Sequence, residues 1–192
     1  MADARVCRRE FMAKIKVATN WLDACAGCHM SLLDIDELIL ELIKHVELTS
    51  TPITDLKHPP KEGVEVGILT GAVSDSHQVE VALEMRERAK ILIAMGDCAV
   101  FGGICTMRNF FDKEELLEYA YTKTASTDEN GQVPRSPELG KLLDRVHAVN
   151  EIVPVDVHLP GCPPPADAIW YVLTELLAGR IPVLAGEKLT YQ

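Results

Sequence analysis

Short apolar runs that end in glycine alternate along this chain with segments of helical periodicity. The clearest run is residues 91–95, Ile-Leu-Ile-Ala-Met, which is continuously apolar and is bounded by Gly96. Residues 64–70 form another such run, which ends at Gly71. A strand that helices cover on both faces of a parallel sheet has this pattern. The alternation therefore predicts an α/β protein with a parallel sheet and right-handed crossovers.

The periodicity also predicts where the individual elements lie. We expect strands over residues 14–20, 46–54, 64–70, 91–95 and 152–159, and helices over residues 29–44, 77–90, 110–122 and 138–147. Asp75 or Ser76 is suited to cap the second of these helices. A last helix is expected to begin at Pro164 and Pro165 and to end near Gly179, a residue that favours a C-terminal cap.

This order of elements matches a known arrangement of strands. Pro52 places the strand that contains it at an edge of the sheet, because proline has no N–H to donate. The pattern is that of a flavodoxin-like doubly wound parallel sheet of strand order 2-1-3-4-5. Residues 102–150 are then an insertion before the last strand. We expect one domain over residues 14–192, preceded by an arm of residues 1–13.

Composition excludes several classes of function. The chain has 192 residues, of which 47% are hydrophobic and 25% charged, so it is long and apolar enough to bury a core. Its net charge of −10 makes it a poor candidate for binding nucleic-acid backbones. No apolar run approaches the roughly 20 residues of a membrane-spanning helix.

The cysteines indicate metal or redox chemistry rather than disulfides. There are six of them: Cys7, Cys25, Cys28, Cys98, Cys105 and Cys162. Arg8 and Arg9 resemble a twin-arginine export signal, but Lys14 and Lys16 interrupt the apolar run that such a signal requires. We therefore expect a cytoplasmic protein, and thiols in a reducing compartment are more often metal ligands or redox groups.

Four of these cysteines follow expected strands. Cys25 and Cys28 lie after the first strand, Cys98 lies three residues past residue 95, and Cys162 lies three residues past Leu159. Ligands of an open parallel sheet bind outside the carboxyl ends of its strands. The four thiols are therefore expected to meet at one edge of the sheet.

Four convergent thiols indicate either zinc or an iron–sulfur cluster. Gly27, Gly96 and Gly161 lie beside them, and a large cluster needs the close backbone approach that glycine permits. Zinc, or no metal at all, remains open on these grounds. A thioredoxin-like dithiol would leave Cys98 and Cys162 without a role. A flavin phosphate bound by residues 70–74 has only weak support, because glycine after a strand is also an ordinary turn.

Three motifs carry a resemblance to the small subunits of nickel–iron hydrogenases. They are Asn20-Trp21-Leu22 with Cys25-Ala26-Gly27-Cys28-His29-Met30-Ser31, then Gly96-Asp97-Cys98-Ala99-Val100-Phe101-Gly102-Gly103, and Leu159-Pro160-Gly161-Cys162-Pro163-Pro164. The chain is most similar to the cytoplasmic, NAD-reducing, bidirectional (Hox-type) members. The resemblance implies one [4Fe–4S] cluster held by Cys25, Cys28, Cys98 and Cys162, with no catalytic residue in this chain.

The resemblance also implies partners. Hydrogen would be cleaved at a nickel–iron centre in a large subunit, and this chain would pass electrons between that centre and diaphorase subunits containing FMN and further iron–sulfur clusters. Related quinone-reductase subunits of complex I have adjacent cysteines at the first ligands, whereas Ala26 and Gly27 separate them here. A complex-I-like cluster subunit and a zinc-binding interaction module remain the alternatives. We expect Cys105 to be a buried thiol near the site and Cys7 to have no chemical role.

Overall fold

A computed structural model describes residues 14–186 and Leu189. The expected arm of residues 1–13, including Cys7 and the two arginines, lies outside the described residues. In the part that is described, no helix is both long and apolar enough to cross a membrane.

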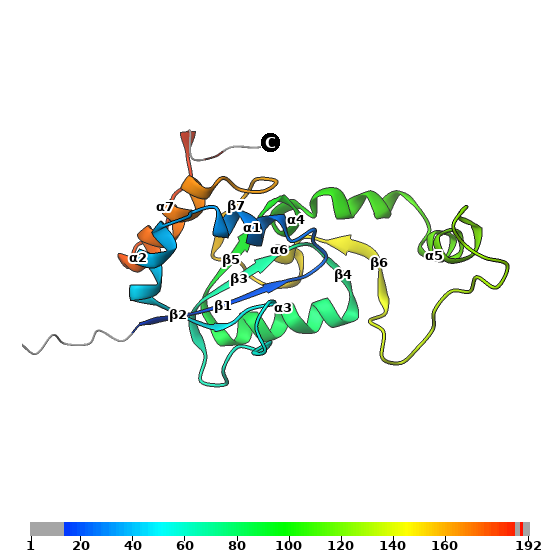
Figure 1. The fold of residues 1–192 in the computed structure, drawn as a ribbon, viewed down its shortest axis with the longest axis horizontal. Helices are drawn as coiled ribbons and strands as arrows, with labels where there is room; N and C mark the ends of the chain where they lie inside the picture. Colours follow the sequence, from blue (N-terminus) through cyan, green and yellow to red (C-terminus); the bar gives the residue numbers. More distant parts are fainter. Residues whose placement is uncertain (1–13, 187–188, 190–192) are drawn as a thin grey trace, which may run out of the picture.

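A parallel sheet of five strands forms the centre of the molecule (Figure 1). Its strands lie in the order β2-β1-β3-β5-β7. Their bounds are β1 Ile15–Trp21, β2 Val46–Ser50, β3 Val64–Thr70, β5 Ala89–Met95 and β7 Val157–Leu159. Counted within this sheet alone, the order is 2-1-3-4-5, so the predicted flavodoxin-like topology is confirmed. Strand β2 lies at an edge, as predicted, but it ends at Ser50, so it is shorter than the predicted strand over 46–54 and Pro52 lies in the turn after it.

Helices cover both faces of this sheet (Figure 1). Helices α3 (Ser76–Arg88), α4 (Asp97–Phe101) and α6 (Val149–Ile152) pack on the face to which Leu69 and Leu92 point. Helix α7 (Ala166–Leu177), with α1 (Gly27–Leu33) and α2 (Leu38–His45), packs on the face of Ile68 and Ile93. Neighbouring residues of β3 and β5 thus point to opposite cores, which explains why these strands are apolar without alternation.

Local signals place several helix ends as predicted. The Asp75 carboxylate accepts a hydrogen bond from the Gln78 N–H at 2.9 Å and caps α3. Pro165 is the N-cap of α7. Gly179 follows the end of α7 with φ 72°, and its N–H donates to the Leu176 carbonyl. Asp75 and Pro165 thus mark the beginnings of their helices and Gly179 marks the end of one, each through its own side chain or backbone conformation.

The helix predicted over residues 29–44 is interrupted. Helix α1 ends at Leu33, α2 begins at Leu38, and Asp36 between them has φ 51°. Aspartate tolerates this left-handed conformation because its short side chain makes local hydrogen bonds. The spacing of apolar residues continued through the break and did not reveal it.

The helix predicted over residues 138–147 is wrong. Residues Leu142–His147 form β6, which pairs antiparallel with β4 (Val73–Asp75). The Asn109 amide holds the outer side of β6: its oxygen accepts the Val146 N–H at 2.7 Å, and its nitrogen donates to the Val146 carbonyl at 2.9 Å. One side chain therefore supplies the two hydrogen bonds that a neighbouring strand would make.

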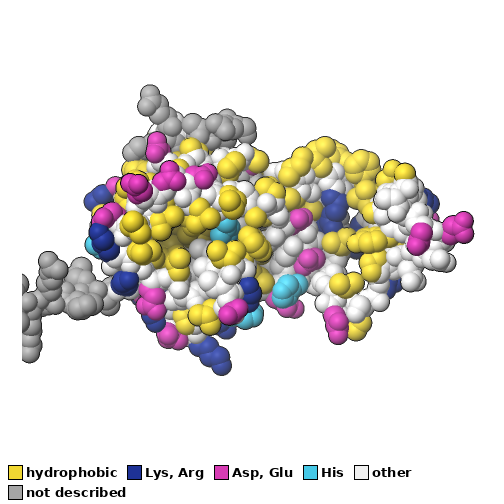
Figure 2. All heavy atoms as spheres, in the orientation of Figure 1, with side chains coloured by type: hydrophobic (Ala, Val, Ile, Leu, Met, Phe, Trp, Pro, Cys, Tyr) yellow, Lys and Arg dark blue, Asp and Glu magenta, His cyan; other side chains and the backbone are white. Residues whose placement is uncertain are grey.

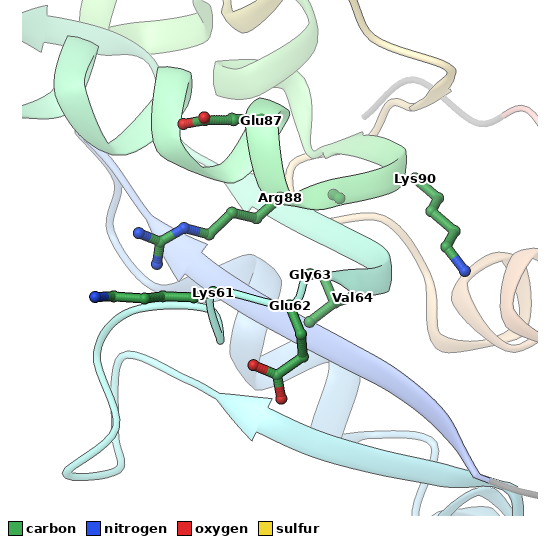
Figure 3. A pocket seen from close by; sticks show the side chains of 8 residues that line it. Lys61, Glu62, Gly63, Val64, Glu87, Arg88 and Lys90 are labelled. Atoms are coloured by element: carbon green, nitrogen blue, oxygen red, sulfur yellow. The ribbon is translucent and has the colours of Figure 1, made fainter.

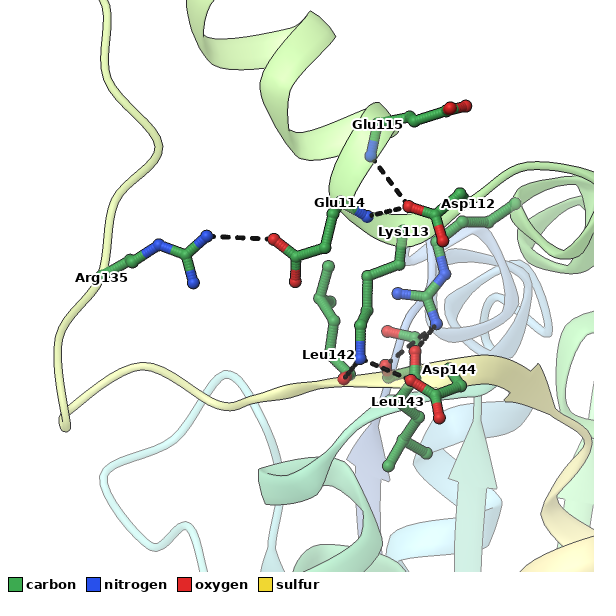
Figure 4. A network of polar contacts seen from close by, with 10 residues as sticks. Asp112, Lys113, Glu114, Glu115, Arg135, Leu142, Leu143 and Asp144 are labelled. Atoms are coloured by element: carbon green, nitrogen blue, oxygen red, sulfur yellow. Dashed lines mark hydrogen bonds and ion pairs between the residues drawn. The ribbon is translucent and has the colours of Figure 1, made fainter.

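Residues 102–150 leave the sheet between β5 and β7 as an insertion, and its middle projects from the body as an arm (Figure 1). It contains a 3₁₀ helix η1 (Gly103–Phe110), α5 (Lys113–Glu118) and a π-helical turn η2 (Tyr119–Lys123), so the helix predicted over 110–122 begins later and changes type. The strand predicted over 152–159 is shorter because α6 extends to Ile152. Lys113 joins α5 to Asp144 of β6, and Arg135 pairs with Glu114 (Figure 4).

Candidate metal centre

The structure brings the four predicted cysteines to the carboxyl edge of the sheet. Cys25 lies in the loop after β1, and Cys28 lies in the first turn of α1. Cys98 lies in α4, directly after β5, and Cys162 lies between β7 and α7. Cys25 and Cys162 are exposed, whereas Cys28 and Cys98 are half-buried. The group of thiols thus reaches from the protein interior to its surface.

The pKa values of two of these thiols are raised by burial and by the other cysteines, so the four thiols lie near one another. The pKa of Cys28 is raised to about 12, first because burial disfavours its thiolate and then because Cys98, Cys25 and Cys162 lie near it. Burial also raises the pKa of Cys162, with further contributions from Cys98, Asp97 and Cys25. Four thiolates gathered in one protein site require a compensating positive charge, which is what a metal centre provides.

Zinc and an iron–sulfur cluster, the two metal sites that the sequence left open, place different demands on the thiols. Across residues 14–186, no group of three His, Cys, Asp or Glu side chains is arranged to hold one ion. The four sulfur ligands of a structural zinc site must all lie about 2.3 Å from one centre. A cluster with four iron atoms accepts thiolates that are farther apart, since each binds a different iron.

Glycine brings the backbone against three of the sulfur atoms. A Cβ atom on Gly96, which has φ +91°, would lie 2.3 Å from Cys28 Sγ. A Cβ on Gly103 would lie 2.8 Å from Cys98 Sγ, and one on Gly27 would lie 3.3 Å from Cys25 Sγ. The Gly27 N–H donates to Cys25 Sγ at 3.4 Å. This cradle has the close approach and the amide donor that an iron–sulfur cluster requires.

Hydrogen bonds join the loops that carry the thiols. The Asp97 N–H donates to the Gly161 carbonyl at 3.0 Å, and the Gly161 N–H donates to Asp97 Oδ1 at 2.7 Å. The buried Ser31 hydroxyl of α1 donates to the Pro164 carbonyl. Sequence reasoning gave no role to Asp97 or Ser31, although each lies within three residues of a cysteine, which is the signal that points to them.

Cys105 lies beside the group of thiols. Its sulfur donates to the Asp23 carbonyl at 3.2 Å, and the side chain is half-buried rather than fully buried. Burial raises the pKa of Cys105 to about 12, with further contributions from Asp23 and Cys98. Its expected position near the site is therefore confirmed, and it connects η1 to the loop that carries Cys25.

His29 leaves one buried nitrogen without a partner. Its ring meets Trp21 edge to face with centroids 5.5 Å apart, and its Nδ1 lies 3.2 Å from Thr70 Oγ1. Nε2 is buried and makes no hydrogen bond to any described residue. Burial lowers the pKa of His29, so the ring is neutral near pH 7. An orphaned polar atom beside Cys28 fits a site that accommodates a further group.

The possible flavin loop is closed. Residues 70–74 are all buried. The Ala72 N–H donates to the Asp23 carbonyl at 3.0 Å, and the Ser74 N–H donates to Gln78 Oε1 at 2.7 Å. A phosphate needs free amides that point into an open loop. Residues 70–74 therefore do not form the flavin phosphate site that the sequence left open.

Exposed hydrophobic side chains lie near this edge. Figure 2 shows them along the margin that η1 occupies in Figure 1. Those of α4, η1 and the residue after η1 are Phe101, Ile104, Met107, Phe110 and Phe111. Phe110 is the most exposed, at 80%. Aromatic residues and methionine gathered on a surface are typical of a protein–protein interface.

Comparisons with known sequences extend across most of the chain. Residues 25–176 match the protein family described as NADH ubiquinone oxidoreductase, 20 Kd subunit. The delta subunit of the NAD-reducing hydrogenase HoxS of Cupriavidus necator is 40% identical over 182 residues, which cover 94% of this chain and 86% of that subunit. A subunit of the F420-non-reducing hydrogenase of Methanothermobacter marburgensis is 38% identical, and the match covers 87% of this chain. This chain spans only about half, 54%, of that longer subunit.

Solved structures agree with these relatives. A chain of an NAD⁺-reducing [NiFe]-hydrogenase in the H₂-reduced state superimposes with a TM-score of 0.90 at 40% identity. The match covers 94% of this chain and 100% of that one. A [NiFeSe] hydrogenase chain of Desulfovibrio vulgaris Hildenborough, with 18% identity and a TM-score of 0.54, shares the fold over 86% of this chain and 60% of its own length.

Proposed function

The chain belongs to the family of the NADH ubiquinone oxidoreductase 20-kDa subunit, and we propose that it is the electron-transfer small subunit of an NAD-reducing nickel–iron hydrogenase. Residues 14–192 are its single iron–sulfur domain in this proposal. The observation that carries the proposal is the meeting of four thiols from three strand ends within a glycine cradle. The relatives named above are hydrogenase subunits, which supports the assignment of the complex.

The chain's own residues hold and shield one [4Fe–4S] cluster. Cys25, Cys28, Cys98 and Cys162 supply the thiolates, and the Gly27 amide donates a hydrogen bond to the first of them. A bound cluster of this type supplies one-electron transfer, and nearby charge, amide hydrogen bonds and exclusion of water set its potential. Cys28 and Cys98 are half-buried, so the protein excludes water from the inner side of the site.

The outer side of the site faces a partner. Cys25 and Cys162 are exposed, and the apolar residues of α4 and η1 lie on the same chain segment as Cys98. A surface of this kind is covered in a stable complex because its burial is favourable. The large subunit, which carries the nickel–iron centre, covers this edge and thereby brings its own centre close to the thiols.

The remaining partners follow from the same assignment. Diaphorase subunits with FMN and further iron–sulfur clusters exchange electrons with this chain, and the complex is a cytoplasmic hetero-oligomer. The chemistry on hydrogen and on NAD takes place in those other subunits. This chain contributes no catalytic residue in the proposal.

One other function has a specific observation in its favour, because the matching family is described by a quinone-reductase subunit. A complex-I-like role would use the same four thiols. Two residues, Ala26 and Gly27, separate the first two cysteines here, and the 40% identical relative is a hydrogenase subunit. Electron transfer within a hydrogenase, rather than to a quinone, is therefore the better-supported function.

Metal analysis of the full-length chain tests the proposal. After anaerobic purification, we expect about four iron atoms and four sulfides per chain. Cys98→Ala or Cys162→Ala is expected to abolish the paramagnetic signal of the reduced cluster at low temperature. Cys7→Ala and Cys105→Ala are the matched controls, since each removes a thiol that the proposal does not use. One zinc ion without sulfide would contradict the cluster, and a signal lost only in Cys105→Ala would contradict the ligand set.

A further inference from the structure

Two ligand cysteines are each preceded by a residue that binds the other loop. Asp97 comes directly before Cys98, and Gly161 comes directly before Cys162. The Asp97 backbone N–H donates to the Gly161 carbonyl at 3.0 Å, while Asp97 Oδ1 accepts the Gly161 N–H at 2.7 Å. Asp97 thus holds both backbone polar groups of Gly161.

The Asp97 carboxylate supplies the hydrogen-bond acceptor that β5 would offer to Gly161 if that strand continued. The preceding bond, from the Gly96 N–H to the Leu159 carbonyl at 2.7 Å, still follows the parallel ladder of β5 and β7. The chain then turns into α4 at Asp97, so β5 offers no further carbonyl to β7. Asp97 Oδ1 takes that place and extends the pairing by one residue, up to the two cysteines.

We propose that Asp97 is a positioning residue that fixes the separation of Cys98 and Cys162 and lowers the reduction potential of the group they hold. This inference rests on the proposed cluster. A charge-assisted hydrogen bond is stronger than a neutral one, which suits it to holding a loop at a fixed distance. A fixed negative charge beside a redox centre also opposes the arrival of an electron.

Electrostatic interactions place the carboxylate within reach of the thiols. After burial and the neighbouring cysteines, Asp97 also contributes to the raised pKa of Cys28. It contributes likewise to the raised pKa of Cys162, behind burial and Cys98. The Asp97 side chain therefore holds the Cys162 loop through a hydrogen bond and acts on Cys28 and Cys162 through its charge.

Two substitutions separate these actions. Asp97→Asn keeps an oxygen that accepts the Gly161 N–H and removes the charge, whereas Asp97→Ala removes both. We expect Asp97→Asn to retain the iron and sulfide of the unmodified chain and to shift the midpoint potential to a more positive value. We expect Asp97→Ala to release iron to a chelator about tenfold faster, since a hydrogen bond to a charged group is lost.

The experiment uses the full-length chain, purified anaerobically, with iron and sulfide measured first. Asp167→Asn is the matched control, because Asp167 is an exposed carboxylate in the first turn of α7. Its charge is screened by solvent, so its removal should leave the potential unchanged. Thermal unfolding of each variant reports whether the fold is intact.

The outcomes are distinct. An unmodified chain without iron and sulfide contradicts the proposed function itself. With the cluster present, an Asp97→Asn potential equal to that of the unmodified chain overturns the charge effect. Iron release from a folded Asp97→Ala at the unmodified rate, with an unchanged paramagnetic line shape, overturns the positioning role. If Asp97→Ala does not fold, Asp97→Leu, which also cannot accept the Gly161 N–H but fills the lost volume, replaces it in the iron-release measurement, and Asp97→Asn still decides the charge effect through its potential.

Discussion

The two ends of the central sheet are built differently. At the carboxyl end, thiols and glycines meet beside exposed apolar side chains. At the amino end, ion pairs connect neighbouring strands, and a hollow of about 500 Å³ is lined by charged residues and the first residues of β3 and β5 (Figure 3). Lys16 of β1 pairs with Glu62, which lies in the turn before β3, and Lys90 of β5 pairs with Glu65 of β3. The amino end thus carries charged groups that pair with one another, and the carboxyl end forms the candidate site.

One glycine at each end of the sheet allows the two ends to be compared by mutation. Gly63 at the amino end and Gly96 at the carboxyl end have nearly the same φ, +90° and +91°. A Cβ on Gly63 would lie 2.9 Å from the Arg88 carbonyl, whereas one on Gly96 would lie 2.3 Å from Cys28 Sγ. A positive φ, which glycine adopts readily, is used in a tight turn at one end and beside a sulfur atom at the other.

The largest effect is expected from Gly96→Ala. The new methyl group displaces Cys28 Sγ, so we expect the purified chain to lose most of its iron, measured per folded molecule. Gly63→Ala serves as the control, with a similar backbone cost but a clash only with Arg88. It should lower the melting temperature and keep the iron content. Equal iron contents in the two variants would remove the distinction between the ends.

A smaller effect is expected from Asp156, at the amino end of β7. Its carboxylate accepts from Arg86 Nη1 at 2.6 Å and from the Leu92 N–H at 2.7 Å. Burial opposes ionisation, but these hydrogen bonds outweigh it and hold the pKa of Asp156 below its usual range. Asp156→Ala should therefore lower the free energy of unfolding by about 1 kcal/mol, a value reduced by the exposure of the pair.

The pH dependence gives the sign of this contribution. A carboxyl with a lowered folded-state pKa stabilises the protein above its unfolded pKa of about 4 and loses that contribution as the pH falls through the folded value. Urea unfolding should thus show the full difference between Asp156→Ala and the unmodified chain near neutral pH and a smaller one in acid. The iron content should not change. A difference that grew in acid would contradict the assigned direction.

The smallest effect is expected from the ion pair on the surface. Lys90 and Glu65 are joined at 3.1 Å, but their side chains are 74% and 40% exposed. Such pairs contribute little because solvent screens them, so Lys90→Ala should change the free energy of unfolding by less than about 0.5 kcal/mol. Denaturant titration checks this value. A loss as large as that of Asp156→Ala would show that single ion pairs at this end carry more of the stability than their exposure indicates.

The sheet was predictable because its signals are local. The apolar run of residues 91–95 lies within β5, and residues 64–70 coincide with β3. Asp75 and Gly179 marked helix ends through their own side chain or backbone. Each of Cys25, Cys28, Cys98 and Cys162 follows a predicted strand. Because parallel strands end at the same edge of a sheet, their meeting could be predicted without knowledge of tertiary contacts.

The errors arose where distant residues decide the structure. Residues 142–147 carry no strand signal of their own and become β6 because β4 and Asn109 supply hydrogen bonds to them. The break at Asp36 is a different case, because it depends on one local φ angle that the spacing of apolar residues does not reveal. The role of Asp97 could not be predicted either, because its hydrogen-bond partner, Gly161, is 64 residues away in the chain.

The last strand of the sheet has a consequence for the order of synthesis. Strand β7 has three residues and pairs with β5, and Cys162 follows it. A chain emerging from the ribosome therefore exposes Cys25, Cys28 and Cys98 long before their fourth companion exists. The complete set of thiols forms only when β7 docks, so the proposed cluster could be assembled only after the whole central sheet has been synthesised. A ribosome that stalls before residue 157 leaves a product that lacks the fourth thiol.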